Sequence, residues 1–168
     1  MMKNLFQILC GLFLVVSYSS CMHSEEDKVD VLIIGGGASG VTSGIQSARM
    51  GANTLILEES TWLGGMLTSA GVSAVDGNYR LPAGLWGEFK NRLSDYYGGL
   101  DSLKTGWVSN VLFEPSVGNE ILHEMVAAEN NLKVWKQACL EEVKRTGDEW
   151  IAKVKVEGQG VKTVRAKI

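Results

Sequence analysis

Residues 30–40 (DVLIIGGGASG) are the feature that most restricts what this chain can fold into. The unbroken apolar run at 31–34 predicts a strand buried on both faces of a parallel sheet. Three consecutive glycines follow, and a helical pattern then begins with Val41, Ile45 and Ala48 on one face. A buried strand that turns on glycines into a helix predicts an α/β fold built from a Rossmann-like βαβ unit.

The three glycine positions of a G-x-G-x-x-G motif are occupied by Gly35, Gly37 and Gly40. In dinucleotide-binding folds the first glycine permits the tight turn, the second lets a pyrophosphate approach the backbone, and the third lets the helix pack on the strand. The helix start at Ala38 and Ser39 offers free N–H groups and a positive dipole end to phosphates. These five residues are therefore predicted to bind a cofactor phosphate, the alternative being a glycine-rich turn in an unrelated α/β unit.

A second strand, at 54–57, is followed directly by Glu58. This spacing fits an acid that holds a ribose hydroxyl of a dinucleotide. Glu59 is the neighbouring candidate, and Glu58 is preferred because it stands at the end of the strand. The alternative is that both glutamates are merely solvated.

A second glycine-rich segment, 60–71, carries the glycine pair Gly64 and Gly65. Together with the first motif and Glu58, the run LGGMLT at 63–68 resembles the amino end of FAD-dependent oxidoreductases of the glutathione-reductase superfamily, flavoproteins with two dinucleotide-binding domains. The resemblance implies FAD as cofactor, with this second segment close to the pyrophosphate and the flavin. Gly64, Gly65 and Thr68 inherit that expectation, against the alternative of a flexible surface loop.

Two helices and a third core strand follow in the middle of the chain. One helix places Leu85, Phe89 and Leu93 on one face, another spans about 116–130, and the strand spans 132–135. In the resembling family, the segment after this strand touches the adenine, which makes Leu140 a candidate for binding, with plain core packing as the alternative. Cys139 is predicted to be a small buried residue.

The last part of the chain alternates between apolar and polar residues. It predicts a three-stranded antiparallel meander with its first turn at 146–148. In the resembling flavoproteins such a meander is a crossover, followed by another parallel strand and a substrate domain. Residues 29–168 are therefore expected to be the amino-terminal part of an FAD-binding domain, incomplete and with an exposed hydrophobic edge.

The first 28 residues are predicted to lie outside the fold. Residues 1–20 have a positive start, a short apolar run and a small polar end, which indicates a secretory signal peptide. Cys21 follows as in a bacterial lipoprotein signal, so lipidation there would anchor the chain to a membrane, the alternative being an ordinary cysteine. Residues 21–28 are expected to form an acidic tether, which gives an exported protein, periplasmic or held at a membrane.

Composition excludes several other function classes. The 168 residues carry a net charge of −3, which provides no basic face for nucleic acid. The three cysteines lack C-x-x-C spacing, so neither a metal cluster nor a redox pair is predicted. His123 lies beside a packed helix face and is interpreted as structural, and no serine lies in a nucleophile elbow, so no catalytic residue is assigned.

The sequence thus favours the FAD-binding portion of an exported oxidoreductase that acts on a small-molecule substrate of unknown identity. One alternative is an NAD(P)-binding module without flavin chemistry, since the first motif would serve it equally. The glycine pair after Glu58 favours FAD. Another alternative is a non-catalytic lipoprotein remnant of such an enzyme.

Overall fold

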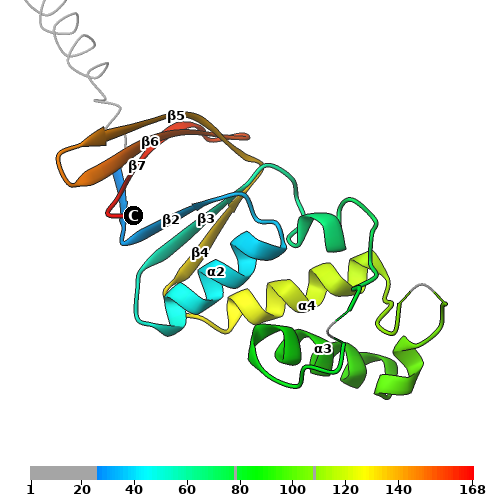
Figure 1. The fold of residues 1–168 in the computed structure, drawn as a ribbon. Coiled ribbons are helices and arrows are strands. Elements are labelled where there is room, and N and C mark those ends of the chain that lie inside the picture. The colour runs from blue at the N-terminus through cyan, green and yellow to red at the C-terminus, as the bar shows by residue number, and fades with distance from the viewer. Residues whose placement is uncertain (1–25, 78, 108) are drawn as a thin grey trace, which may run out of the picture.

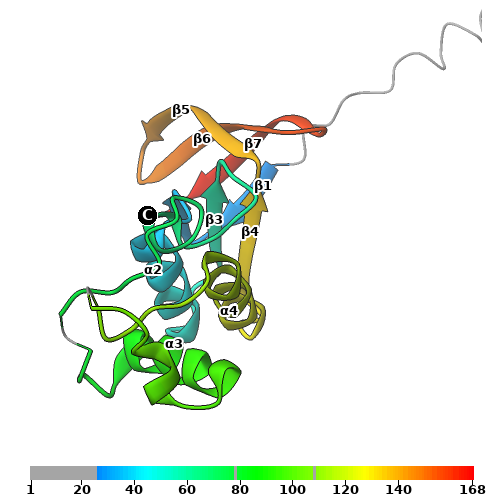
Figure 2. The same ribbon diagram turned by 90° about the vertical axis from the view of Figure 1, so that its right-hand side faces the viewer.

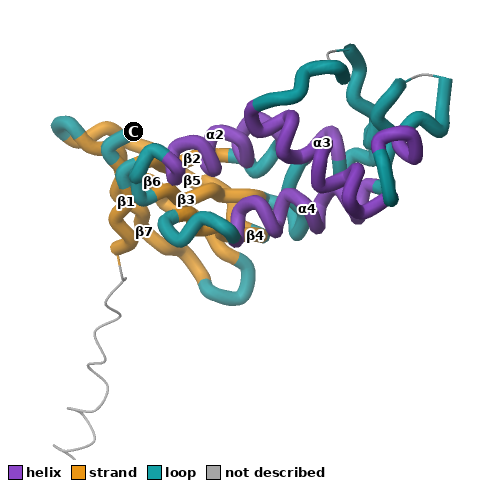
Figure 3. Tube along the Cα trace, turned by 90° about the horizontal axis from the view of Figure 1, so that it is seen from below, coloured by secondary structure: helices purple, strands orange, loops and turns teal. Residues whose placement is uncertain are grey.

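The computed structural model describes residues 26–77, 79–107 and 109–168, in three layers (Figure 1). A four-stranded sheet lies above a three-stranded parallel sheet, and helices cover the other face of the parallel sheet. Figure 3 separates the strand-rich part from the helical part, in which α3 lies farthest from the strands. The expected α/β fold with a parallel sheet and an antiparallel meander is confirmed.

The parallel sheet has the order β2-β3-β4. Its strands are β2 (Val31–Ile34), β3 (Thr54–Glu58) and β4 (Leu132–Lys136), each within a residue of its predicted place. Helix α2 (Ala38–Arg49) connects β2 to β3 and buries Val41, Gly44, Ile45 and Ala48. The carboxyl ends of β2 and β3 therefore meet at one edge, next to the start of α2.

Strand β2 is only half-buried, and the prediction that both of its faces are buried was wrong. It is one of the two edge strands of the parallel sheet, and Ile34 at its end is 55% exposed. Ile168 covers the start of this edge, because its N–H donates to Asp30 O (3.1 Å) and its carbonyl accepts from Leu32 N (2.8 Å). The remainder of the edge is the exposed hydrophobic strand that the sequence predicts.

Two longer helices follow the glycine-rich region. α3 (Gly84–Tyr97) buries Phe89 and Leu93, and α4 (Pro115–Ala127) buries Val117, Ile121, Leu122, Met125 and Val126. Pro115 stands in the first turn of α4, where its missing N–H leaves no bond unmade. Two short 3-10 helices, η1 (Gly65–Leu67) and η2 (Leu100–Leu103), lie in the loops.

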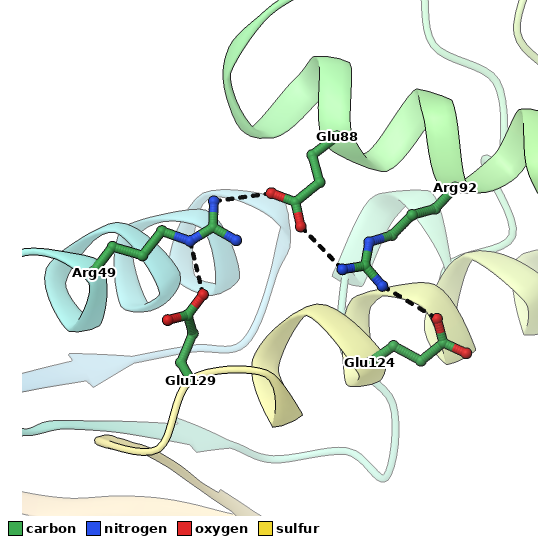
Figure 4. A network of polar contacts seen from close by, with 5 residues as sticks. All are labelled: Arg49, Glu88, Arg92, Glu124 and Glu129. Atoms are coloured by element: carbon green, nitrogen blue, oxygen red, sulfur yellow. Dashed lines mark hydrogen bonds and ion pairs between the residues drawn. The ribbon is translucent and has the colours of Figure 1, made fainter.

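A chain of ion pairs joins α2, α3 and the end of α4 (Figure 4). Arg49 contacts Glu88 at 2.8 Å and Glu129 at 2.7 Å, and Arg92 contacts Glu88 at 3.1 Å and Glu124 at 3.4 Å. Glu88 lies in the middle, between the two arginines. The three helices are therefore connected through polar contacts as well as through their apolar faces.

The second sheet has the order β1-β7-β6-β5. Its antiparallel meander consists of β5 (Ala138–Thr146), β6 (Glu149–Val156) and β7 (Gly160–Ala166), as the alternating sequence predicts. The apolar parity packs against the parallel sheet, where Ala152, Val154 and Val164 meet Leu55 and Leu57 of β3. The polar parity faces outward.

The predicted tether ends earlier than residue 28, because β1 (Glu26–Val29) pairs in parallel with β7 (Figure 2). Two features support this short polar strand. Its exposure alternates along the chain, and Arg165 of β7 holds Glu26 at 2.9 Å. The predicted signal peptide, and Cys21 with it, lie outside the described residues.

Candidate functional site

The first glycine turn joins the end of β2 to the start of α2. Gly35 has a φ of +98°, which an L side chain rarely adopts, and its N–H donates to Leu57 O at 2.8 Å. No atom lies within 4 Å of the place where a Cβ would stand on Gly35 or on Gly37. On Gly40 a Cβ would stand 1.9 Å from Gly35 O, so the helix packs directly on the turn. Space for a Cβ therefore exists at Gly35 and at Gly37 but not at Gly40.

Helix α2 begins at Ala38 with Gly37 as its N-cap. No side chain caps this end, and its first turn carries no acidic residue. The first N–H groups of a helix have no partner within the helix, and they carry the positive end of its dipole. The amides of Ala38, Ser39 and Gly40 therefore form a place suited to a phosphate.

The Glu58 carboxylate is held against this turn. Its Oε2 accepts from Gly36 N and its Oε1 from Ser60 N, both at 2.7 Å. A Cβ on Gly36 would lie 2.9 Å from Oε2, so only glycine allows the carboxylate so close. Glu58 therefore points toward the glycines, on the side where the sequence predicts a ribose.

A pocket of about 200 Å³ opens beside this carboxylate. It is lined by Ile34, Gly35, Leu57, Glu58, Glu59, Ala138 and Leu140. Leu140 is half-buried on β5 and forms part of its wall, on the far side from β2. The first turn, the strand-end acid and Leu140 thus surround one space, although more than eighty residues of sequence separate Glu58 from Leu140.

The second glycine segment lies directly beside the first. Gly64 N donates to Gly36 O at 2.8 Å, and a Cβ on Gly65 would lie 3.1 Å from Gly37 Cα. Gly64 and Gly65 have φ values of +104° and +52°. Both bends therefore present backbone and no side chain at their meeting point.

Thr68 is buried, and only 1% of it is exposed. Its hydroxyl donates to Leu63 O, which closes the loop around η1. The side chain thus fixes the second glycine segment from behind. Its hydroxyl is therefore used within the protein, and almost none of the residue is open to a ligand.

Asn119 of α4 takes part in this arrangement without any sequence signal. Its Oδ1 accepts from Leu63 N at 2.9 Å, which attaches the second glycine segment to the helix beneath it. Ser60, whose N–H donates to Glu58, was also missed. Neither residue belongs to a motif: the fold brings Asn119 to Leu63, whereas Ser60 binds Glu58 through a local turn of the backbone.

Cys139 is exposed, and the prediction that it is buried was wrong. Strand parity decides this: Ala138 before it faces the core, so Cys139 faces outward. Its Sγ lies 3.6 Å from Glu59 Oε1, and this carboxylate raises the pKa of the thiol. The local charge therefore keeps the thiol protonated and poorly reactive.

His123 and two aromatic residues of α3 belong to the helical part of the molecule. His123 is half-buried on α4, and burial lowers its pKa. Trp86 packs against the helical core, while the Tyr97 hydroxyl accepts from Glu114 N at 3.0 Å. Among residues 26–77, 79–107 and 109–168, no three His, Cys, Asp or Glu side chains gather as a metal site. Nor does any helix in those ranges combine the length and apolarity needed to cross a membrane.

The site thus combines two side-chain-free bends, a helix N-terminus, and an acid that borders a small pocket. Amides and a helix dipole suit a pyrophosphate, and a strand-end carboxylate suits ribose hydroxyls. An adenine dinucleotide carries both groups.

Comparisons with known proteins agree with this geometry. The sequence model of the family described as FAD dependent oxidoreductase matches residues 30–168. No curated protein sequence matches the chain.

Solved structures of similar fold include a monooxygenase, a flavoprotein/dehydrogenase and a disulfide reductase. p-Nitrophenol 4-monooxygenase from Pseudomonas putida DLL-E4 is 15% identical with a TM-score of 0.51, covering 84% of this chain and 40% of its own. A flavoprotein/dehydrogenase from Cytophaga hutchinsonii is 18% identical with a TM-score of 0.53, covering 84% and 38%. Bacillithiol disulfide reductase from Bacillus cereus is 15% identical with a TM-score of 0.53, also covering 84% and 38%. At these identities the likeness concerns the fold alone, and the chain spans 40% or less of each of these proteins.

Proposed function

The chain belongs to the FAD dependent oxidoreductase family, and on that premise we propose that residues 30–168 are the FAD-binding part of a glutathione-reductase-like flavoprotein that is exported from a bacterium. FAD is the cofactor of the family. When bound, the flavin accepts a hydride or electrons from a substrate and passes them on. Everything else in the proposal concerns what this chain does to hold and orient that cofactor.

One observation carries the proposal: the two glycine bends lie side by side with their backbones open. Gly64 N donates to Gly36 O, and a Cβ on Gly35 or on Gly37 would meet no atom within 4 Å other than those of its chain neighbours. The amides at the start of α2 are proposed to bind the pyrophosphate. The Glu58 carboxylate is proposed to accept from the ribose hydroxyls, with the adenosine end toward Leu140.

The second bend favours FAD over NAD(P) alone. An NAD(P) module requires only the first bend and the acid. Gly64 and Gly65 add a second stretch of backbone whose φ values are positive and whose side chains are absent. Such a stretch gives a longer cofactor further amides to bind beyond its pyrophosphate.

An absorption spectrum tests the proposal. The purified full-length chain is mixed with FAD, freed from excess cofactor by gel filtration, and scanned in the visible region. We expect flavin bands that elute with the protein and leave it on denaturation. A colourless protein that instead binds NADH would support a nicotinamide module, and one that binds neither would support a remnant that has lost its reaction.

Export and anchoring form a separate part of the proposal. The apolar run at the amino end and Cys21 support a lipoprotein whose FAD-binding domain lies outside the cytoplasm. Expression in a bacterial host with a radiolabelled fatty acid is expected to label the chain, and Cys21→Ser is expected to abolish the label. Label that persists in Cys21→Ser would refute anchoring at this residue.

A further inference from the structure

A second pocket, of about 590 Å³, lies in the helical part of the molecule between α3, η2 and the loop at 79–82. We refer to it as the α3–η2 pocket. Its lining includes the cations Arg80, Lys90 and Lys104, and no carboxylate among the described residues. None of its lining residues belongs to either glycine bend, so the pocket is separate from the site proposed for FAD.

Lys90 is the most unusual residue of the α3–η2 pocket, since only 7% of it is exposed. Its Nζ donates to the carbonyl oxygens of Tyr79 (2.7 Å) and Leu81 (2.8 Å). No carboxylate within the described ranges forms an ion pair with it. An ammonium has three N–H donors, of which these two carbonyls use two, and the Nζ also lies 5.9 Å from the centre of the Trp86 ring. A buried charge is normally accompanied by an opposite charge.

The guanidinium of Arg80 adds a second cation without a carboxylate. Its Nε donates to the Tyr79 hydroxyl at 3.1 Å, and the group lies 5.4 Å from the centre of that ring. A guanidinium has five N–H donors in a planar fork that matches carboxylate and phosphate oxygens. Lys104 differs, because Asp101 already holds it at 2.8 Å. Lys90 and Arg80 are therefore the two lining cations that form no ion pair with a described carboxylate.

One part of the wall of the α3–η2 pocket is apolar. Leu100, Leu103 and Val111 line it, and the pocket volume lies within the usual range for small-molecule sites. Inorganic ions would leave this wall without contacts. We propose that the α3–η2 pocket binds a small organic anion. Its carboxylate or phosphate binds Lys90 and Arg80, and its apolar body packs against Leu100, Leu103 and Val111.

Nuclear magnetic resonance of the ¹⁵N-labelled full chain tests this proposal, with and without added FAD. The probes are phenylacetate, phenyl phosphate and the uncharged phenylacetamide, which share one apolar body. We expect an anion to shift amides of 79–81, 90–91 and 100–104 in a saturable way below about 20 mM. The amide should bind roughly tenfold more weakly, because it lacks the charge. Preference for phenyl phosphate or for phenylacetate identifies the charged group.

Matched charge variants complete the test. Arg80→Gln should weaken binding of the preferred anion roughly tenfold, because it removes a charged donor from an exposed position without touching the core. Lys162→Gln removes the same charge beside Trp135 on the far sheet and should change nothing. Equal binding of anion and amide, or no saturable shift with either anion, would overturn the proposal. The flavin spectrum of the same samples is measured separately, so failure here leaves the FAD proposal standing.

Discussion

At the scale of single residues, the glycines of the first motif differ in whether the fold leaves space for a side chain. Gly37 has a φ of −64° and free space around it, so an L residue fits the fold there. Gly40 has no such space, because Gly35 O lies 1.9 Å from its would-be Cβ. Substitution at Gly37 therefore tests the cofactor, whereas substitution at Gly40 tests the fold.

Gly37→Val should abolish FAD binding, with a loss of affinity of roughly a hundredfold or more, because the side chain occupies the place of a phosphate. Equilibrium dialysis against FAD measures it. Ser43→Val adds similar bulk at an exposed position of the same helix and should bind FAD normally. If Gly37→Val keeps its affinity, the motif does not bind a phosphate.

Gly40→Ala should lower the free energy of unfolding by roughly 2 kcal/mol or more, as a side chain forced into a packed contact does. Urea unfolding of the cofactor-free chain measures it. An unchanged midpoint would mean that α2 does not pack on the turn as described.

Glu58→Gln should weaken FAD binding roughly tenfold, since it removes the charge that faces the ribose. Glu59→Gln is its matched control, because Glu59 lines the same pocket but contacts Cys139 instead. The same dialysis measures both variants. A larger loss in Glu59→Gln would move the acid's role to that residue.

Single-residue contacts were predicted unevenly from the sequence. The glycine positions and Glu58 were foreseen because each position of the motif has its own steric reason. Asn119 was not foreseen, because its partner Leu63 lies 56 residues away in the chain. Ser60 was not foreseen although its partner Glu58 is two residues away, because it contributes a backbone N–H that any residue could supply. Cys139 was placed inside from the general preference of its side chain, and the parity of β5 overruled that preference.

At the scale of elements, the amphipathic helices and the meander follow from periodicity, whereas β1 does not. Glu26, Asp27 and Lys28 are polar enough to resemble a tether, and only pairing with β7 makes them a strand. Burial on one face of β2 was also overestimated, because an apolar run does not say how many neighbours a strand has. A local sequence pattern predicts whether a segment is a helix or a strand better than it predicts which elements that segment packs against.

Glu88→Gln should lower the free energy of unfolding at pH 7 by about 1 kcal/mol, because Glu88 joins Arg49 to Arg92. The hydrogen bond from Arg49 is the main cause that lowers the pKa of Glu88 below 4.5. Its contribution is therefore complete above that pH and is lost as the pH falls through the folded-state pKa.

Urea unfolding between pH 7 and pH 3 follows this contribution. The difference between the wild type and Glu88→Gln should be constant down to about pH 5 and then shrink. Glu120→Gln serves as the control, since Glu120 is exposed on α4 and forms no ion pair with any described residue. A difference that grows on acidification would contradict the ion-pair explanation.

At the scale of the whole molecule, β3 lies between two apolar cores. Leu55 and Leu57 face the antiparallel sheet, while Ile56 faces the helices. Its central position in the parallel sheet explains why its residues are more deeply buried than those of β2. The apolar run at 55–57 predicted a core strand, as the run at 31–34 did, and only the position of each strand in the sheet separates their burial.

Ile56→Ala should therefore cost about 3 kcal/mol of the free energy of unfolding, as the loss of a fully buried side chain does. Ile34→Ala, at the exposed end of β2, should cost less than about 1 kcal/mol. Urea unfolding of the cofactor-free chain compares the two. Equal losses would mean that the edge of β2 is covered in solution.

The short connection between β1 and β2, a single residue, bears on how the molecule responds to a stretching force. Asp30 connects β1 of one sheet to β2 of the other. β1 pairs in parallel with β7, and the chain just after β7 lies beside β2. A force that pulls Glu26 away from Ile168 would load the hydrogen bonds between β1 and β7 in shear. All of these hydrogen bonds would then bear the force at the same time. Such an arrangement resists stretching along the line that joins these two residues.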